Sequence, residues 1–120
     1  MSKYDYFMEY TRLIEAPKTI KWEGEICDVY YDFLTITEIS KTRSYWRIRC
    51  KNHNSEYKLY WMERWYLTKE QDLQIDKLKQ GGGYNIGWIR GILFTSHVNI
   101  IVYILEIDFI YYLIKKSTYN

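Results

Sequence analysis

The stretch RSYWRIRCKNHNSEYKLYWMERW, residues 43–65, contains two runs of alternating side chains separated by a short polar segment. Alternation with a period of two is typical of β-strands that have one buried face. The polar segment, residues 52–55, consists of residue types that favour tight turns. This stretch therefore predicts a β-hairpin.

A four-residue turn predicts a register in which the numbers of paired residues add up to 107. In this register Trp46 lies opposite Trp61 on the buried face. On the outer face Arg49 lies opposite Lys58, with Tyr60 nearby. Like charges that are directly opposed destabilise a hairpin, so this pair favours a role for the outer face beyond folding.

The outer face of the predicted hairpin combines basic and aromatic side chains. Residues 41–66 contain seven basic and two acidic residues, whereas the whole chain has a net charge of +2. Guanidinium groups grip phosphates or carboxylates, and aromatic rings stack on bases or anchor protein interfaces. A solvated strand face without any ligand is the alternative, because exposed strands commonly carry charges. The predicted binding residues are Arg43, Tyr45, Arg47, Arg49, Lys58, Tyr60 and Arg64.

Two helices and further strands are predicted outside the hairpin. Thr68 and Gln71 form a capping box at the start of one helix, and a glycine triplet marks its end. The predicted elements are a short helix at 3–15, strands at 26–39, 86–95 and 98–114, and the capped helix at 69–80. They predict one α+β domain over residues 1–120, with a small antiparallel sheet of five or six strands.

The aromatic content of 19% exceeds what one small core normally holds. We therefore expect exposed rings at an interface, and a homodimer through the long C-terminal strand is one use for them. The apolar segment 98–114 contains Glu106 and Asp108, which argue against a membrane-spanning helix. Two cysteines give no disulfide framework, and the N-terminus lacks a signal-peptide pattern, so we expect a cytoplasmic protein.

Residues with metal or catalytic chemistry are few and scattered. Cys50 and His53 form an isolated Cys-x-x-His, and a zinc site would need Cys27 and His97 to converge on it. A Cys–His nucleophilic pair would use the same residues. We predict no metal, no cofactor and no catalytic residue on this basis.

The leading functional prediction is a non-enzymatic binding or inhibitory accessory protein. The composition favours residues with AT-rich codons, which suggests a phage or mobile element and a counter-defence type of role. Its partner would be a protein or nucleoprotein complex that docks on the basic aromatic hairpin. The alternative is binding of single-stranded nucleic acid or a nucleotide on the same face. A small enzyme that uses Glu106 and Asp108, which share one face of the predicted strand, is the third hypothesis.

Overall fold

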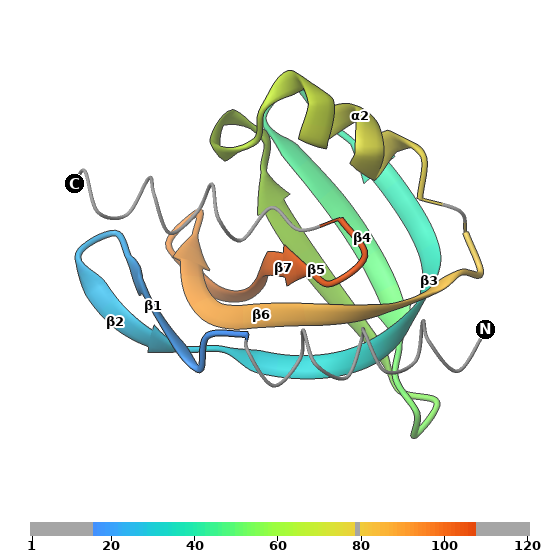
Figure 1. Ribbon diagram of the computed structural model, residues 1–120, viewed down its shortest axis with the longest axis horizontal. Coiled ribbons are helices and arrows are strands. Elements are labelled where there is room, and N and C mark those ends of the chain that lie inside the picture. The colour runs from blue at the N-terminus through green and yellow to red at the C-terminus, as the bar shows by residue number, and fades with distance from the viewer. Residues whose placement is uncertain (1–15, 79, 108–120) are drawn as a thin grey trace.

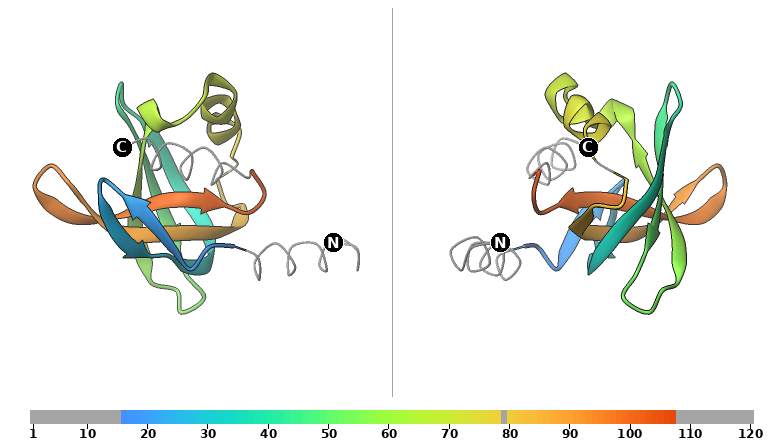
Figure 2. Two further views of the ribbon diagram at one scale, coloured as in Figure 1. Left: turned by 60° about the vertical axis from the view of Figure 1, so that its left-hand side comes forward. Right: turned by 90° about the vertical axis from the view of Figure 1, so that its right-hand side faces the viewer.

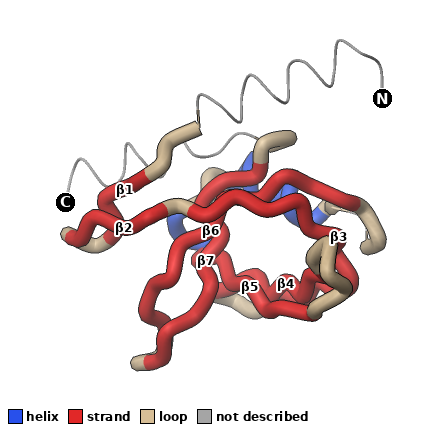
Figure 3. The backbone as a smooth tube through the Cα atoms, turned by 90° about the horizontal axis from the view of Figure 1, so that it is seen from below, coloured by secondary structure: helices blue, strands red, loops and turns tan. Residues whose placement is uncertain are grey.

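The computed structural model describes residues 16–78 and 80–107, and strands dominate it. Five strands close into a barrel, and two others form a separate small sheet (Figures 1 and 3). The elements are β1 (Thr19–Trp22), β2 (Glu25–Asp28), β3 (Tyr30–Lys41), β4 (Tyr45–Lys51), β5 (Tyr57–Glu63), the 3-10 helix η1 (Arg64–Tyr66), α2 (Lys69–Asp76), β6 (Gly83–Leu93) and β7 (Ser96–Ile104). The predicted helix at 3–15 lies outside the described residues.

The barrel has the strand order β3-β4-β5-β7-β6 and closes between β6 and β3. Its neighbouring strands are antiparallel except β5 and β7, which are parallel. The long strand β3 closes the ring because its first half pairs with β6 and its second half pairs with β4. A register shift between Ile36 and Glu38 bends the strand where it changes partner. The sheet is therefore a closed barrel with one parallel pair, and the prediction of a purely antiparallel sheet was wrong in this respect.

The predicted register of the β4–β5 hairpin is wrong by one residue. Trp46 lies opposite Met62 and Ile48 lies opposite Tyr60, so paired numbers add up to 108. The backbone N–H of Asn52 donates to the carbonyl of Glu56 at 3.0 Å, which leaves a loop of three residues. The last of them, Ser55, has a positive φ of 62°, as such loops require. A loop of odd length shifts the pairing by one and exchanges the two faces of β5.

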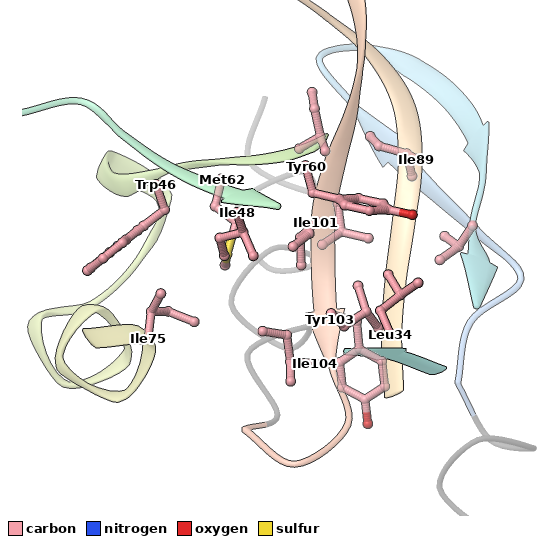
Figure 4. Close-up of a cluster of buried hydrophobic side chains, with 14 of the residues drawn as sticks. Leu34, Trp46, Ile48, Tyr60, Met62, Ile75, Ile89, Ile101, Tyr103 and Ile104 are labelled. Atoms are coloured by element: carbon pink, nitrogen blue, oxygen red, sulfur yellow. The ribbon is translucent and has the colours of Figure 1, made fainter. Parts of the chain in front are cut away.

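The corrected register places the even-numbered residues of both strands inside the barrel, except Lys58 near the start of β5, which is exposed. Trp46, Ile48, Tyr60 and Met62 are all at most 2% exposed. Figure 4 shows them converging, with Ile75 of α2 below Trp46 and Tyr60 reaching across the interior towards the strand that carries Ile89. Tyr60, which was predicted on the binding face, is therefore a core residue.

Other parts of the sequence prediction were confirmed or corrected by the structure. The capping box is present: the Thr68 hydroxyl accepts from the Gln71 N–H, and the Gln71 side chain accepts from the Thr68 N–H. The helix ends at Asp76, earlier than predicted. The strand predicted at 26–39 is interrupted at Val29, which separates β2 from β3.

The C-terminal strand is shorter than predicted. β7 ends at Ile104 and a turn follows, so Glu106 does not lie on a strand. Asp108 and the rest of the proposed dimer strand, residues 108–114, lie outside the described residues. Among residues 16–78 and 80–107, no helix has both the length and the apolar character needed to cross a membrane.

The register predicts different costs for replacing the two tryptophans of the hairpin. Trp46→Ala should lower the free energy of unfolding by about 3 to 5 kcal/mol, because it empties a buried site. Trp61→Ala should cost about 1 to 2 kcal/mol, because Trp61 is only partly buried. Urea unfolding of both variants tests this. Equal and large losses would favour the Trp46–Trp61 core pair and contradict the observed register.

Candidate functional site

The outer face of the β4–β5 hairpin collects the odd-numbered residues of both strands. We call this surface the hairpin face; it comprises Tyr45, Arg47, Arg49, Lys51, Tyr57, Leu59, Trp61 and Glu63. Because the register brings Arg47 directly opposite Trp61, a guanidinium group and an indole ring are neighbours across the two strands. Burial raises the pKa of Glu63, the carboxylic acid on this face.

An aromatic cluster covers one end of the hairpin face. Tyr45 and Trp61 meet edge to face with ring centroids 6.2 Å apart. Phe94 contacts both rings, with centroid distances of 4.9 Å to Tyr45 and 6.0 Å to Trp61. Phe94 comes from the turn between β6 and β7, a hairpin that projects from the barrel in Figure 2. Although it touches two rings, Phe94 is 63% exposed, so most of its surface is free to contact a ligand.

The turn that carries Phe94 is strained. Phe94 and Thr95 have φ angles of 53° and 64°, in the left-handed region. Two-residue hairpin turns of this kind strongly prefer Asn-Gly or Asp-Gly, and a β-branched residue at positive φ is a genuine outlier. Strain of this kind persists where the surrounding structure or a function requires it. The turn therefore marks Phe94 as a candidate functional residue.

The two arginines of the hairpin face are available to a ligand. In the part of the chain that the structure describes, neither the Arg47 nor the Arg49 guanidinium group makes an ion pair or a hydrogen bond; the Thr37 hydroxyl donates to the backbone carbonyl of Arg49 at 3.1 Å. Arg49 pairs across the sheet with Glu38 of β3 and lies opposite Leu59 on β5. The predicted opposition of Arg49 and Lys58 is thus wrong, and the clustering of positive charge rests on the outward residues of β4.

Arg64 has a structural role. Its guanidinium group donates to both carboxylate oxygens of Asp72, at 3.0 and 2.8 Å, and to the carbonyl of Thr42 at 2.8 Å. Asp72 also accepts from the indole N–H of Trp46 at 2.8 Å. These bonds join the β3–β4 loop, the buried tryptophan and α2, and the hydrogen bond from Arg64 is the main cause of the lowered pKa of Asp72.

Cavities flank the hairpin face on two sides. One of about 380 Å³ lies between the β3–β4 loop and α2, and its lining includes Arg43, Lys69 and the 57% exposed Trp65. Another of about 270 Å³ lies between β5 and β7, and its lining includes Lys58 and Trp61. Arg43 and Lys58 therefore border the face without lying on it.

The structure brings together three of the predicted binding residues, Tyr45, Arg47 and Arg49. It places Arg43 and Lys58 at the borders, Tyr60 in the core, and Arg64 outside the hairpin face in a bidentate ion pair with Asp72. Sequence reasoning missed Trp61, which was assigned to the core, and Phe94. Phe94 fell inside the strand predicted at 86–95, and its residue type is not one that such turns favour, so the sequence carried no signal for it.

The candidates for metal binding and catalysis do not assemble in the described residues. Cys50 is buried, and burial raises its pKa to about 12, opposite to the shift that activates a nucleophile. Within 16–78 and 80–107, no three His, Cys, Asp or Glu side chains lie close enough to hold a metal ion. Glu106 accepts hydrogen bonds from the backbone and side-chain amides of Asn85, which gives it a structural role.

Comparison of the chain with protein family models, with curated proteins and with solved structures finds no match.

Acid should weaken the link between α2 and the barrel. A lowered folded-state pKa means that Asp72 stabilises the fold fully above the ordinary aspartate pKa and loses this contribution as the pH falls through the folded value. Asp72→Asn should cost about 1 to 3 kcal/mol at pH 7. The difference from the wild type should shrink below about pH 4 in urea unfolding curves. A difference that does not change with pH would contradict this role.

Relief of the turn strain should stabilise the protein. Thr95→Gly should raise the free energy of unfolding by about 1 kcal/mol, because glycine adopts a positive φ without a steric penalty. Thr95→Ala keeps the strain and serves as the matched control, with little expected change. Thermal unfolding of both variants measures the difference. A glycine variant less stable than the alanine variant would show that the turn is unstrained.

Proposed function

We propose that the protein binds single-stranded nucleic acid on the hairpin face, without catalysing a reaction. The observation that carries this proposal is the aromatic cluster of partly buried Tyr45 and Trp61 and exposed Phe94, which lies beside the unpaired guanidinium groups of Arg47 and Arg49. Proteins that bind single strands combine these two elements, because every base has a flat face that stacks on a ring and every phosphate attracts a cation.

The connectivity of the barrel supports the same proposal. The five strands β3 to β7, with α2 between the third and fourth and a parallel contact between the third and fifth, have the connectivity of an OB-fold. OB-folds bind oligonucleotides and oligosaccharides on their second and third strands and on the loops beside them. Here those strands are β4 and β5, and the turn with Phe94 is one of the loops. This similarity concerns the fold alone, and one fold can host many functions. The proposal therefore rests on the residues of the hairpin face.

The arrangement explains why single strands would be preferred over duplexes. Stacking on Trp61 or Phe94 needs an unpaired base whose face is accessible. The β6–β7 hairpin projects from the barrel and brings Phe94 against Tyr45 and Trp61 on this face. The cations Arg47, Arg49 and Lys51 follow one another along β4, where a flexible backbone can reach them.

Docking on a protein is the second candidate function, and it retains the predicted accessory or inhibitory role. The observation that favours it is the exposure of Tyr57, Trp65 and Phe94, each more than half exposed around the same face. Tyrosine, tryptophan and arginine are also the residues enriched at protein-interface hot spots. The dependence of affinity on salt concentration distinguishes the two candidate functions. Phosphate binding releases counterions and weakens steeply as salt rises, whereas an aromatic-anchored protein interface depends less on ionic strength.

The proposal is tested by fluorescence anisotropy with labelled single-stranded DNA, single-stranded RNA and duplex DNA over a salt series. With about three to five phosphate contacts, the logarithm of the association constant should fall with the logarithm of salt with a slope of about −2 to −3.5. Trp61→Ala should weaken binding by about 1 to 3 kcal/mol through lost stacking. The double variant Arg47→Glu with Arg49→Glu should weaken binding more than Trp61→Ala does. Its association constant should also depend less on salt concentration.

Lys21→Glu with Lys77→Glu is the matched control, because it makes the same change in charge at exposed positions away from the hairpin face. If this control weakened binding as much as the Arg47 and Arg49 variant, binding would depend on net charge and not on the site. Absence of single-strand binding at low salt would refute the proposal and leave docking on a protein as the candidate.

A further inference from the structure

The barrel has an open seam between β5 and β7. These parallel strands share two residue pairs, Tyr60 with Asn99 and Trp61 with Ile100. In the described residues, the backbone pairing of the two strands is limited to these two positions. The side-chain amide of Asn99 donates to the carbonyl of Leu59 at 3.3 Å and so bridges the seam.

The same asparagine positions a cation at the seam. The guanidinium group of Arg90 on β6 donates through Nη1 to the side-chain oxygen of Asn99 at 3.0 Å. Arg90 is exposed. In the described residues it makes no ion pair, and the geometry of a guanidinium group leaves further N–H donors for a second acceptor.

A cleft of about 270 Å³ opens at this point, and its lining is cationic. The lining residues are Lys58, Leu59, Trp61, Arg90, His97, Val98 and Asn99. They include three basic side chains and no carboxylate. Two acidic residues, Glu23 and Glu25, line an adjacent cavity of about 190 Å³ that also includes Arg90 and His97 in its lining. The volume lies below the usual range for sites that enclose a whole small molecule, so the cleft suits a small anionic group.

Trp61 belongs both to this cleft and to the aromatic cluster. A ligand with a flat ring on the cluster would thus place a neighbouring charged group near Arg90. A base and its phosphate have this relation within a nucleotide. A terminal phosphate carries about −1.5 to −2 charges at pH 7, more than the single charge of an internal phosphodiester, and it matches several converging cations better.

We propose that the seam cleft is a phosphate subsite that holds the terminal phosphate of a bound strand through Arg90, Lys58 and His97. The base attached to that end stacks on the aromatic cluster, and this half of the inference rests on the proposed function. Asn99 acts as a positioning residue because it orients the guanidinium group of Arg90.

The test compares one labelled oligonucleotide with a 5′-phosphate, with a 3′-phosphate and with free hydroxyl ends. One of the phosphorylated forms should bind about 10-fold more tightly than the unphosphorylated form, as expected for charge-assisted hydrogen bonds. Arg90→Gln should reduce this ratio to about one, and His97→Gln should reduce it in part. Lys21→Gln, at an exposed position outside the cleft, is the control and should keep the ratio. Circular dichroism spectra verify that each variant is folded.

Competition with inorganic phosphate and with a nucleoside monophosphate distinguishes three ligands of the cleft: free phosphate, a mononucleotide and the phosphorylated end of a strand. Equal affinity of the three oligonucleotides would overturn the subsite and leave the proposed function standing. Binding of the monophosphate that Arg90→Gln abolishes, without binding of any oligonucleotide, would support the cleft and refute single-strand binding. Absence of binding for all probes would overturn both proposals.

Discussion

The structure depends first on the length of one turn. The three-residue loop after Asn52 fixes the pairing of β4 with β5, and this pairing decides which side of β5 faces the interior. Tyr60 and Met62 enter the barrel, and Trp61 faces outwards. A loop longer by one residue would exchange these roles, because a register slip of one residue turns a strand over.

A second hairpin, β6–β7, which is distant in the sequence, completes the surface around the outward-facing Trp61. β6 and β7 close the barrel, and their turn brings Phe94 against Tyr45 and Trp61. The same hairpin supplies Arg90 to the seam beside β5. The site is therefore assembled by barrel closure, and its strained turn shows that the position of Phe94 is maintained at a cost in backbone energy.

Local signals in the sequence predicted much of the fold. The β4–β5 hairpin, the capping box at Thr68 and the strand-rich character follow from short-range patterns, and the structure has all three. The register could not be predicted because both faces of β5 carry large apolar residues, so alternation fitted either pairing. Closure of the barrel could not be predicted either, because it depends on a bulge in β3 and on pairing between strands distant in the sequence.

The candidate site was predictable only where it lies within one hairpin. Arg47, Arg49 and Tyr45 were found because they alternate along β4. Phe94 and Arg90 reach the site through tertiary contacts, and a single sequence carries no direct signal of these.

The most direct test of this account is an NMR titration that follows the indole N–H signals of the tryptophans as a single-stranded oligonucleotide is added. The account predicts that the signal of Trp61 shifts strongly, together with the backbone amides of Tyr45 and Arg47. The signal of Trp46, whose indole N–H is held by Asp72 inside the fold, should change little. Shifts confined to other surfaces, or no shift at Trp61, would contradict the claim that the hairpin face is the binding site.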